Sequence, residues 1–300
     1  MHRKNILITG ATGNIGSALF NGFREINCHE NTIAADYLHP DNPGLKLYSA
    51  DTPYRQLDFE KPEGFDKALQ DIDIVFLLRP PHLADIKRVF APFLEAMKRN
   101  SISKIVFLSV QGAESQSFIP HHKLEKLILS YGMEYVFLRP SYFMQNLTTT
   151  LLYDIRNRGQ IFIPSGRLKF NWVDAHDIGL VGACVLSDFD RYRNQALEIT
   201  GQDFAGMDEA VSLINHYAQT DLRYVSPNLL HFYRVKRKQG MPPAMIFVMI
   251  MLHFLPRLGK NKPRLTNIVK EVTGKEPVSL EEFIKREASA FIQAKKSHPD

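Results

Sequence analysis

Residues 6–23, ILITGATGNIGSALFNGF, decide the fold because they join a buried strand to a helix through a glycine-rich turn. The apolar run Asn5–Thr9 predicts a strand covered on both faces of a sheet. Residues 15–24 place apolar side chains at the spacing of a helix. A strand, a glycine turn and a helix in this order are typical of the first unit of a dinucleotide-binding fold.

The three glycines of the turn each meet a separate geometric need. Gly10 permits the tight bend, Gly13 lets the backbone approach a pyrophosphate, and Gly16 lets the helix lie close to the strand. Backbone N–H groups near Asn14 and Ile15, together with the helix dipole, favour an anion at this point. The sequence therefore predicts a phosphate-binding loop.

Further apolar runs alternate with helical segments as far as residue 140. Predicted strands cover 31–35, 55–57, 73–78, 104–109 and 134–140, and predicted helices cover 62–72, 84–99 and 124–131. Such strands between helices imply a parallel sheet covered on both faces, in a doubly wound α/β fold. Residues 170–188 are expected to return a strand and a helix to this sheet, and 195–200 to add a last strand.

The expected organisation is a Rossmann core over 1–150, to which 171–200 return, and a smaller cap over 151–170 and 201–300. The cap is predicted to be discontinuous and mainly helical, because no strong strand pattern follows residue 201. Its apolar run AMIFVMIMLHFL, residues 244–255, is too short to span a bilayer. That run fits either the core of the cap or an adaptable lid over a flat apolar substrate.

Composition is that of an ordinary soluble globular protein, with 44% hydrophobic and 23% charged residues, and the presence of only two isolated cysteines favours the reducing cytoplasm. Two isolated cysteines and no two histidines at i, i+4 predict no metal site, and no G-x-S-x-G supports a serine hydrolase. Basic clusters at 234–238 and 257–264 contribute to the net charge of +5. They are interpreted as a solvated face, with neither direct nucleic-acid binding nor membrane binding expected.

Asp36 lies 20 residues beyond Gly16, where dinucleotide-binding folds place an acid that accepts bonds from the adenosine ribose. No Lys or Arg occurs between Arg24 and Lys46 to receive a 2′-phosphate, so NAD is preferred over NADP. A simple turn residue is the alternative interpretation of Asp36.

Other cofactor contacts are expected at the carboxyl ends of the strands, where open α/β sheets bind ligands. The residues found there are Asp58, Phe59, Leu78, Arg79, Pro80, Ser109, Val110 and Gln111. Arg79 is predicted either to reach a phosphate or a substrate acid, or to be an ordinary surface arginine.

Six segments, in order, resemble the NmrA-like branch of the atypical short-chain dehydrogenases: TGATGNIG, DIVFLLRPP, KIVFLSVQGA, HHKLEKLI, FLRPSYFMQN and WVDAHDIG. The likeness spans nearly the whole chain. That branch includes NAD(P)H-dependent quinone and azo-dye reductases, ergot-alkaloid reductases, and transcriptional co-regulators that bind the dinucleotide without evident turnover.

The resemblance implies a role for each matching residue. It implies a phosphate loop of Gly10, Thr12, Gly13, Asn14, Ile15 and Gly16, and an adenosine site of Asp36, Asp58 and Phe59. It implies a nicotinamide site of Leu78, Arg79, Pro80, Ser109, Val110, Pro140, Ser141, Tyr142 and Phe143. The expected substrate pocket comprises Gln111, Met144, Asn146 and Trp172, although ordinary packing explains the aromatic residues equally well.

The Tyr-x-x-x-Lys motif of typical short-chain dehydrogenases is missing, since none of the 11 tyrosines is followed by Lys four positions later. Its place before the helix holds IPHHKLEKL, residues 119–127. Lys123 is therefore a candidate to bond the ribose and to serve catalysis, with His121 or His122 as proton donor. Neighbouring residues on a helix point about 100° apart, so at most one histidine faces the cofactor. A solvated helix start is the alternative.

The leading hypothesis is an NAD(P)-dependent oxidoreductase that passes a hydride to a small apolar electrophile such as a quinone, enal or imine. Such acceptors need no side-chain acid, because water can supply the proton. The competing hypothesis is a non-catalytic redox sensor that binds NAD(P) and a protein partner, with different affinities for the two redox states. A sugar-nucleotide-modifying enzyme is a third, disfavoured by the missing Tyr.

Overall fold

The computed structural model describes residues 3–42, 44–45, 49, 51–202, 204–258 and 264–292, and the chain forms two compact units. The Rossmann unit comprises Met1–Ser141, Ala175–Thr200 and Thr266–Glu276, and the second unit comprises Tyr142–Asp174, Gly201–Leu265 and Pro277–Asp300. This division differs from the predicted one, since residues 142–150 and 171–174 belong to the second unit and 266–276 return to the Rossmann unit.

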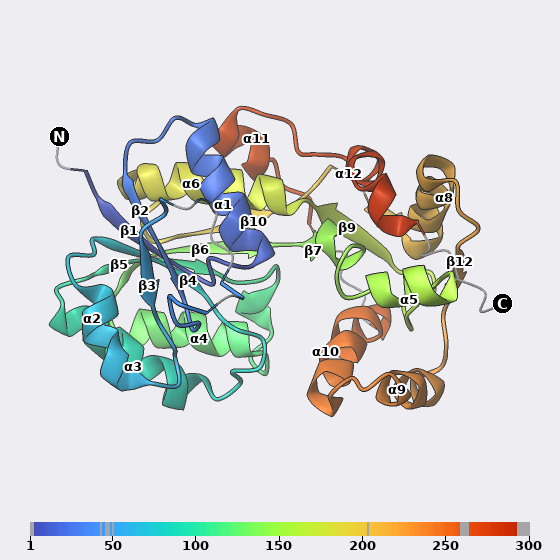
Figure 1. Cartoon of the computed structure of the whole chain (residues 1–300), viewed down its shortest axis with the longest axis horizontal. Coiled ribbons are helices and arrows are strands. Elements are labelled where there is room, and N and C mark those ends of the chain that lie inside the picture. The colour runs from blue at the N-terminus through green and yellow to red at the C-terminus, as the bar shows by residue number, and fades with distance from the viewer. Residues whose placement is uncertain are drawn as a thin grey trace. The chain divides into compact units, whose positions relative to one another are not determined.

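A seven-stranded parallel sheet forms the centre of the Rossmann unit, in the order β10-β6-β5-β4-β1-β2-β3 (Figure 1). Its strands are β1 (Asn5–Thr9), β2 (Asn31–Asp36), β3 (Tyr54–Gln56), β4 (Ile74–Leu78), β5 (Lys104–Leu108), β6 (Glu134–Pro140) and β10 (Gln195–Ile199). The strand order reverses between β1 and β4, which confirms the doubly wound fold. Ligands bind at this switch point in sheets of the class.

Helices cover both faces of this sheet (Figure 1). One face carries α1 (Asn14–Glu25), α6 (Ala175–Ser187) and α11 (Ile268–Thr273), and the other carries α2 (Phe65–Leu69), α3 (Ile86–Arg99) and α4 (Pro120–Ser130). The short α7 (Phe189–Tyr192) precedes β10. Helices α1 and α6 touch backbone to backbone, because a Cβ added to Gly179 would lie 2.4 Å from the carbonyl carbon of Ala18.

Two small sheets and a set of helices form the second unit. The strands β11 (Phe204–Gly206), β9 (Lys169–Val173) and β7 (Tyr142–Phe143) make one sheet, and β12 (Arg223–Val225) pairs with β8 (Gln160–Phe162). The helices are α5 (Leu152–Arg158), α8 (Met207–Ala218), α9 (Leu229–Lys238), α10 (Pro243–His253) and α12 (Leu280–Arg286). Their apolar faces enclose a core that includes Trp172, Phe232, Phe283 and Phe291. This region is mainly helical, as predicted.

Two predicted elements were wrong in detail. β9 does not join the large sheet, because β10 occupies the edge beyond β6 and β9 pairs instead with β7 and β11. α4 begins at Pro120 rather than at residue 124, since Ile119 is extended and proline suits the first position of a helix. The segment from His121 to Lys123 therefore forms the first turn of α4.

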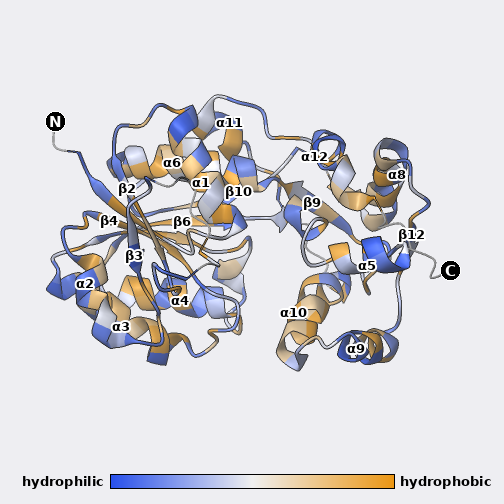
Figure 2. Cartoon of the chain, viewed as in Figure 1, coloured by the Kyte–Doolittle hydropathy of each residue, from blue (hydrophilic) through white to orange (hydrophobic). Residues whose placement is uncertain are grey.

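The apolar run falls on α10, whose sequence PAMIFVMIMLH is apolar at almost every position, and Figure 2 colours most of this helix as hydrophobic. Ile246, Met249 and His253 are buried, whereas Phe247 is 61% and Leu252 is 50% exposed. One side of α10 therefore belongs to the core and the other is open apolar surface. Within the described part of the chain, every helix is too short or too polar to cross a membrane.

Candidate functional site

The turn between β1 and α1 has the geometry of an anion-binding loop. Gly10 has a φ of +64°, in the left-handed region that favours glycine, and Gly13 directly precedes α1. A Cβ added to Gly16 would lie 2.5 Å from the Cα of Ala11, so helix and loop touch directly. No side chain caps α1, so the N–H groups of its first turn are open to a ligand, and the helix dipole favours an anion there.

Asp36 ends β2 and is fixed beside this loop. Its Oδ2 accepts hydrogen bonds from the Thr12 hydroxyl at 2.5 Å and the Thr12 N–H at 3.3 Å, and its Oδ1 accepts from the Tyr37 N–H at 2.8 Å. Because a carboxylate offers about four lone-pair sites and three are taken, one remains for a hydroxyl of a ribose. Lys46, the first cation after Arg24 in the sequence, lies outside the described residues.

Asp58 and Phe59 follow β3 and have different surroundings. The Phe59 ring is buried, with centroid distances of 5.0 Å to Phe90 and 5.1 Å to Phe93. That ring therefore fills the core beneath α3. Asp58 forms an ion pair with Lys61 at 3.4 Å at the edge of the sheet, so of the two side chains it is the better candidate to border an adenine.

Arg79 directly follows β4 and is half-buried. Its Nη1 donates to the carbonyl oxygens of Pro80, Pro81 and Leu83 at 2.9–3.1 Å. Its Nε is buried and meets no hydrogen-bond acceptor among the described residues. Burial lowers the pKa of Arg79 to about 10, so the group remains charged at neutral pH.

A charged network joins the ends of β5 and β6 to α4. Glu125 Oε1 accepts from the Ser109 hydroxyl at 2.6 Å and from Arg139 Nε at 2.9 Å, and Oε2 accepts from Arg139 Nη2 at 2.7 Å. Arg139 also pairs with Glu114 at 2.8 Å. The Glu125 side chain is 5% exposed and that of Glu114 is 50% exposed. This network fixes α4 against the strand ends and engages the Ser109 hydroxyl.

The sequence interpretation missed Glu125 and Arg139, although a signal was present. Arg139 interrupts the apolar run YVFLRP, and Glu125 lies between Leu124 and Ile128 on the buried face of α4. A charge at a buried position is tolerated only with a partner. The two exceptions to the apolar pattern therefore pointed to each other.

The two predicted catalytic histidines face different partners. The His121 ring stacks on Phe107 with a centroid distance of 6.1 Å, and burial, aided by the charge of Arg79, lowers the pKa of His121 to about 3. His122 Nδ1 lies 2.8 Å from the Ala113 carbonyl oxygen, to which it donates. His121 is therefore neutral at neutral pH, which argues against the predicted role of proton donor.

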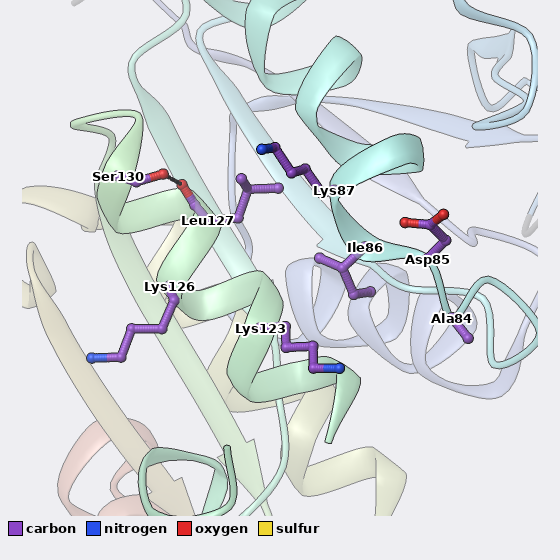
Figure 3. Close-up of a pocket in the computed structure, with 8 residues that line it drawn as sticks. All are labelled: Ala84, Asp85, Ile86, Lys87, Lys123, Lys126, Leu127 and Ser130. Carbon is purple, nitrogen blue, oxygen red and sulfur yellow. Dashed lines mark hydrogen bonds between the residues drawn. The ribbon is translucent and has the colours of Figure 1, made fainter. Parts of the chain in front are cut away.

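Lys123 is exposed and lines an open hollow between α3 and α4, together with Ala84, Asp85, Ile86, Lys87, Lys126, Leu127 and Ser130 (Figure 3). Figure 3 shows Lys123 extending from α4 toward the start of α3 and Lys126 pointing the other way. No other residue of this hollow belongs to the predicted cofactor site. The bond from Lys123 to a ribose stays a prediction.

Tyr142 lies in an aromatic cluster of the second unit. Its hydroxyl donates to His253 Nε2 at 2.7 Å, and His253 Nδ1 donates to the Met249 carbonyl oxygen at 2.6 Å. Burial raises the pKa of Tyr142 and lowers that of His253 to about 4. Trp172 is 2% exposed, and its Nε1 donates to the Ala205 carbonyl oxygen at 2.9 Å. The Trp172 ring therefore fills the core and lines no open pocket.

The other predicted residues divide between the two units. Gln111 donates through Nε2 to Glu198 at 3.2 Å and through its N–H to the Pro140 carbonyl oxygen at 2.9 Å, and the Ser141 N–H donates to Ile199. Met144 is buried in the second unit, and Asn146 hydrogen-bonds to the Tyr142 hydroxyl. Leu78 is the last residue of β4, Val110 lies two residues beyond the end of β5, Pro80 lies in the loop after β4, and Phe143 is half-buried.

The structure thus places the predicted phosphate loop, Asp36 and the residues at the carboxyl ends of β4 and β5 in the same unit, the Rossmann unit. The predicted residues from Tyr142 onward belong to the second unit. In the part of the chain that the structure describes, no group of three or more His, Cys, Asp or Glu is placed to hold a metal ion.

Comparison with known proteins gives the same family as the motifs. Residues 2–255 match the model of the NmrA-like family. An NAD(P)H azoreductase from Xenophilus azovorans is 27% identical over 292 residues, covering 95% of this chain and 99% of the relative. Prestalk A differentiation protein A from Dictyostelium discoideum is also 27% identical, over 285 residues, covering 94% of this chain and 92% of the relative.

The fold also matches solved structures. An NADPH-dependent quinone oxidoreductase from Escherichia coli, complexed with NADPH, superposes with a TM-score of 0.77 over 94% of this chain and 99% of that one. The two sequences are 18% identical, so this likeness concerns the fold alone.

Proposed function

This chain belongs to the NmrA-like family, and we propose that it is an NAD(P)H-dependent reductase that passes a hydride to a small apolar electrophile of the quinone, enal or imine type. The observation that carries the proposal is the phosphate loop beside Asp36. A glycine loop that leaves no room for a Cβ at Gly16, an uncapped helix start and a positioned carboxylate together fit a dinucleotide.

The residues of the Rossmann unit divide the work of binding. The first turn of α1 would hold the pyrophosphate, and Asp36 would orient the adenosine ribose. When bound, the reduced nicotinamide supplies the hydride. Because His121 is neutral, we assign the proton to water, which suffices for acceptors whose reduced form is a stabilised anion.

We propose NAD rather than NADP as the preferred cofactor. The Asp36 carboxylate would repel a 2′-phosphate, and Thr12 and Tyr37 hold that carboxylate in place. The NADPH in the Escherichia coli structure belongs to that protein and does not decide the preference of this one.

An apolar acceptor is supported by α10. Its exposed side presents Phe247, Leu252, Met245 and Val248. Methionine and aromatic surfaces adapt readily to flat apolar molecules. The second unit therefore offers a surface suited to a quinone, whereas a sugar nucleotide would need polar groups in its place.

Steady-state oxidation of NADH with a panel of quinones, enals and imines tests the proposal. We expect turnover by the wild type and its loss in Gly16→Ala, because the new Cβ would collide with the backbone of Ala11. Gly64→Ala is the matched control, since a Cβ at Gly64 meets nothing within 4 Å. If the protein instead binds the oxidised and reduced dinucleotides with different affinities and shows no turnover, it is a redox sensor and not a reductase.

A further inference from the structure

Arg79 presents a hydrogen-bonding edge that no described residue fills. An arginine holds a carboxylate most firmly through two parallel N–H groups. Arg139 does this in the same chain, holding Glu125 through Nε at 2.9 Å and Nη2 at 2.7 Å. Arg79 uses only Nη1, which donates to three backbone carbonyl oxygens.

The remaining edge of Arg79 consists of Nε and Nη2. Nε is buried without an acceptor, and neither nitrogen forms a hydrogen bond or ion pair with a residue that the structure describes. Buried donors without acceptors are rare and unfavourable in native proteins. An acceptor from outside the described chain is therefore expected at this edge.

The position of Arg79 identifies the kind of ligand. It follows β4 at the switch point beside β1, where open α/β sheets bind ligands. The preceding residue, Leu78, would lie 3.0 Å from a Cβ placed on Gly10 of the phosphate loop. The charge of Arg79 also acts on His121 in the first turn of α4. The guanidinium therefore lies close to the strand ends that carry the predicted site.

We propose that Arg79 binds an anionic group, with Nε and Nη2 donating to two oxygens of a phosphate, sulfonate or carboxylate. This inference rests on the proposed function, which offers two sources for the anionic group. The group belongs either to the pyrophosphate of the dinucleotide or to an acidic substituent on the electron acceptor. A planar pair of donors selects such groups over neutral ligands.

Calorimetric titration of the full chain separates the two sources. The probes are NADH, inorganic pyrophosphate and naphthalenesulfonate, none of which requires turnover, so the result does not depend on reductase activity. If the anion belongs to the dinucleotide, Arg79→Gln weakens binding of NADH and pyrophosphate by about 10- to 100-fold and leaves naphthalenesulfonate unchanged. If it belongs to the acceptor, only naphthalenesulfonate binding falls.

Arg55→Gln is the matched control, because Arg55 Nη1 also donates to two backbone carbonyl oxygens, those of Ala68 and Gln70. Arg79→Lys keeps the charge without the parallel donors and should restore only part of the affinity. Unchanged affinity for all three probes in Arg79→Gln would overturn the proposal. Equal losses in Arg79→Gln and Arg55→Gln would also overturn it, and would leave Arg79 as a residue that stabilises its own loop.

Discussion

Replacing Glu125 by alanine tests whether the charged network supports the candidate site. The change leaves Arg139, whose side chain is 12% exposed, with only Glu114 as a partner, and it removes the acceptor of the Ser109 hydroxyl. Breaking a buried ion pair costs about 3–5 kcal/mol. Because Glu114 still neutralises Arg139, we expect Glu125→Ala to lower the free energy of unfolding by about 3 kcal/mol, at the low end of this range.

Glu114→Ala is the matched control for this prediction. Its carboxylate also contacts Arg139, but its side chain is 50% exposed, so its loss should cost about 0–1 kcal/mol. Urea unfolding followed by far-ultraviolet circular dichroism measures both variants. A cost for Glu125→Ala no larger than that for Glu114→Ala would refute the view that burial makes the Glu125–Arg139 pair important.

Two further predictions concern Tyr142 and His176. Tyr142→Phe leaves His253 Nε2 buried without a donor, and it should lower the free energy of unfolding by about 1–3 kcal/mol. We expect this variant to keep its quinone turnover. Loss of turnover in a folded variant would instead give the Tyr142 hydroxyl a catalytic role. His176 donates hydrogen bonds to the carboxylates of Asp177 and Glu25, which raise the pKa of His176 to about 8. The stabilising effect of protonated His176 is therefore complete below the unfolded pKa of about 6.5 and is lost as pH rises through about 8. Urea unfolding across this pH window should show a fall in the free energy of unfolding of the wild type. The fall should be below about 1 kcal/mol because His176 is partly exposed, and the His176→Gln variant should not show it. Identical slopes in both proteins would contradict it.

The large sheet of the Rossmann unit was predictable because each of its strands carries its own signal, whereas the return of α11 to this unit was not predicted. Apolar runs marked the strands, and the turn from Gly10 to Gly16 marked the switch point. The sheet to which β9 belongs was not predictable, because its run FNWV fits the large sheet as well as the small one. What excludes β9 from that sheet is β10 at the edge beyond β6, a fact of tertiary pairing.

The candidate site was predictable where backbone geometry defines it and less so where side chains do. The glycines and Asp36 follow from spacing alone. The neutral state of His121 depends on its packing against Phe107 and on the charge of Arg79, which lies 42 positions away in the sequence. Periodicity carries no information about such contacts.

Calorimetric titration of the wild type and Asp36→Ala with NADH and NADPH tests directly whether the Rossmann unit binds a dinucleotide through Asp36. Thr12 holds the Asp36 carboxylate beside the phosphate loop, so we expect the wild type to bind NADH more tightly than NADPH. We expect Asp36→Ala to weaken NADH binding and to reduce the difference in affinity between NADH and NADPH. Absence of binding by either dinucleotide, or an unchanged preference in Asp36→Ala, would contradict this role of Asp36.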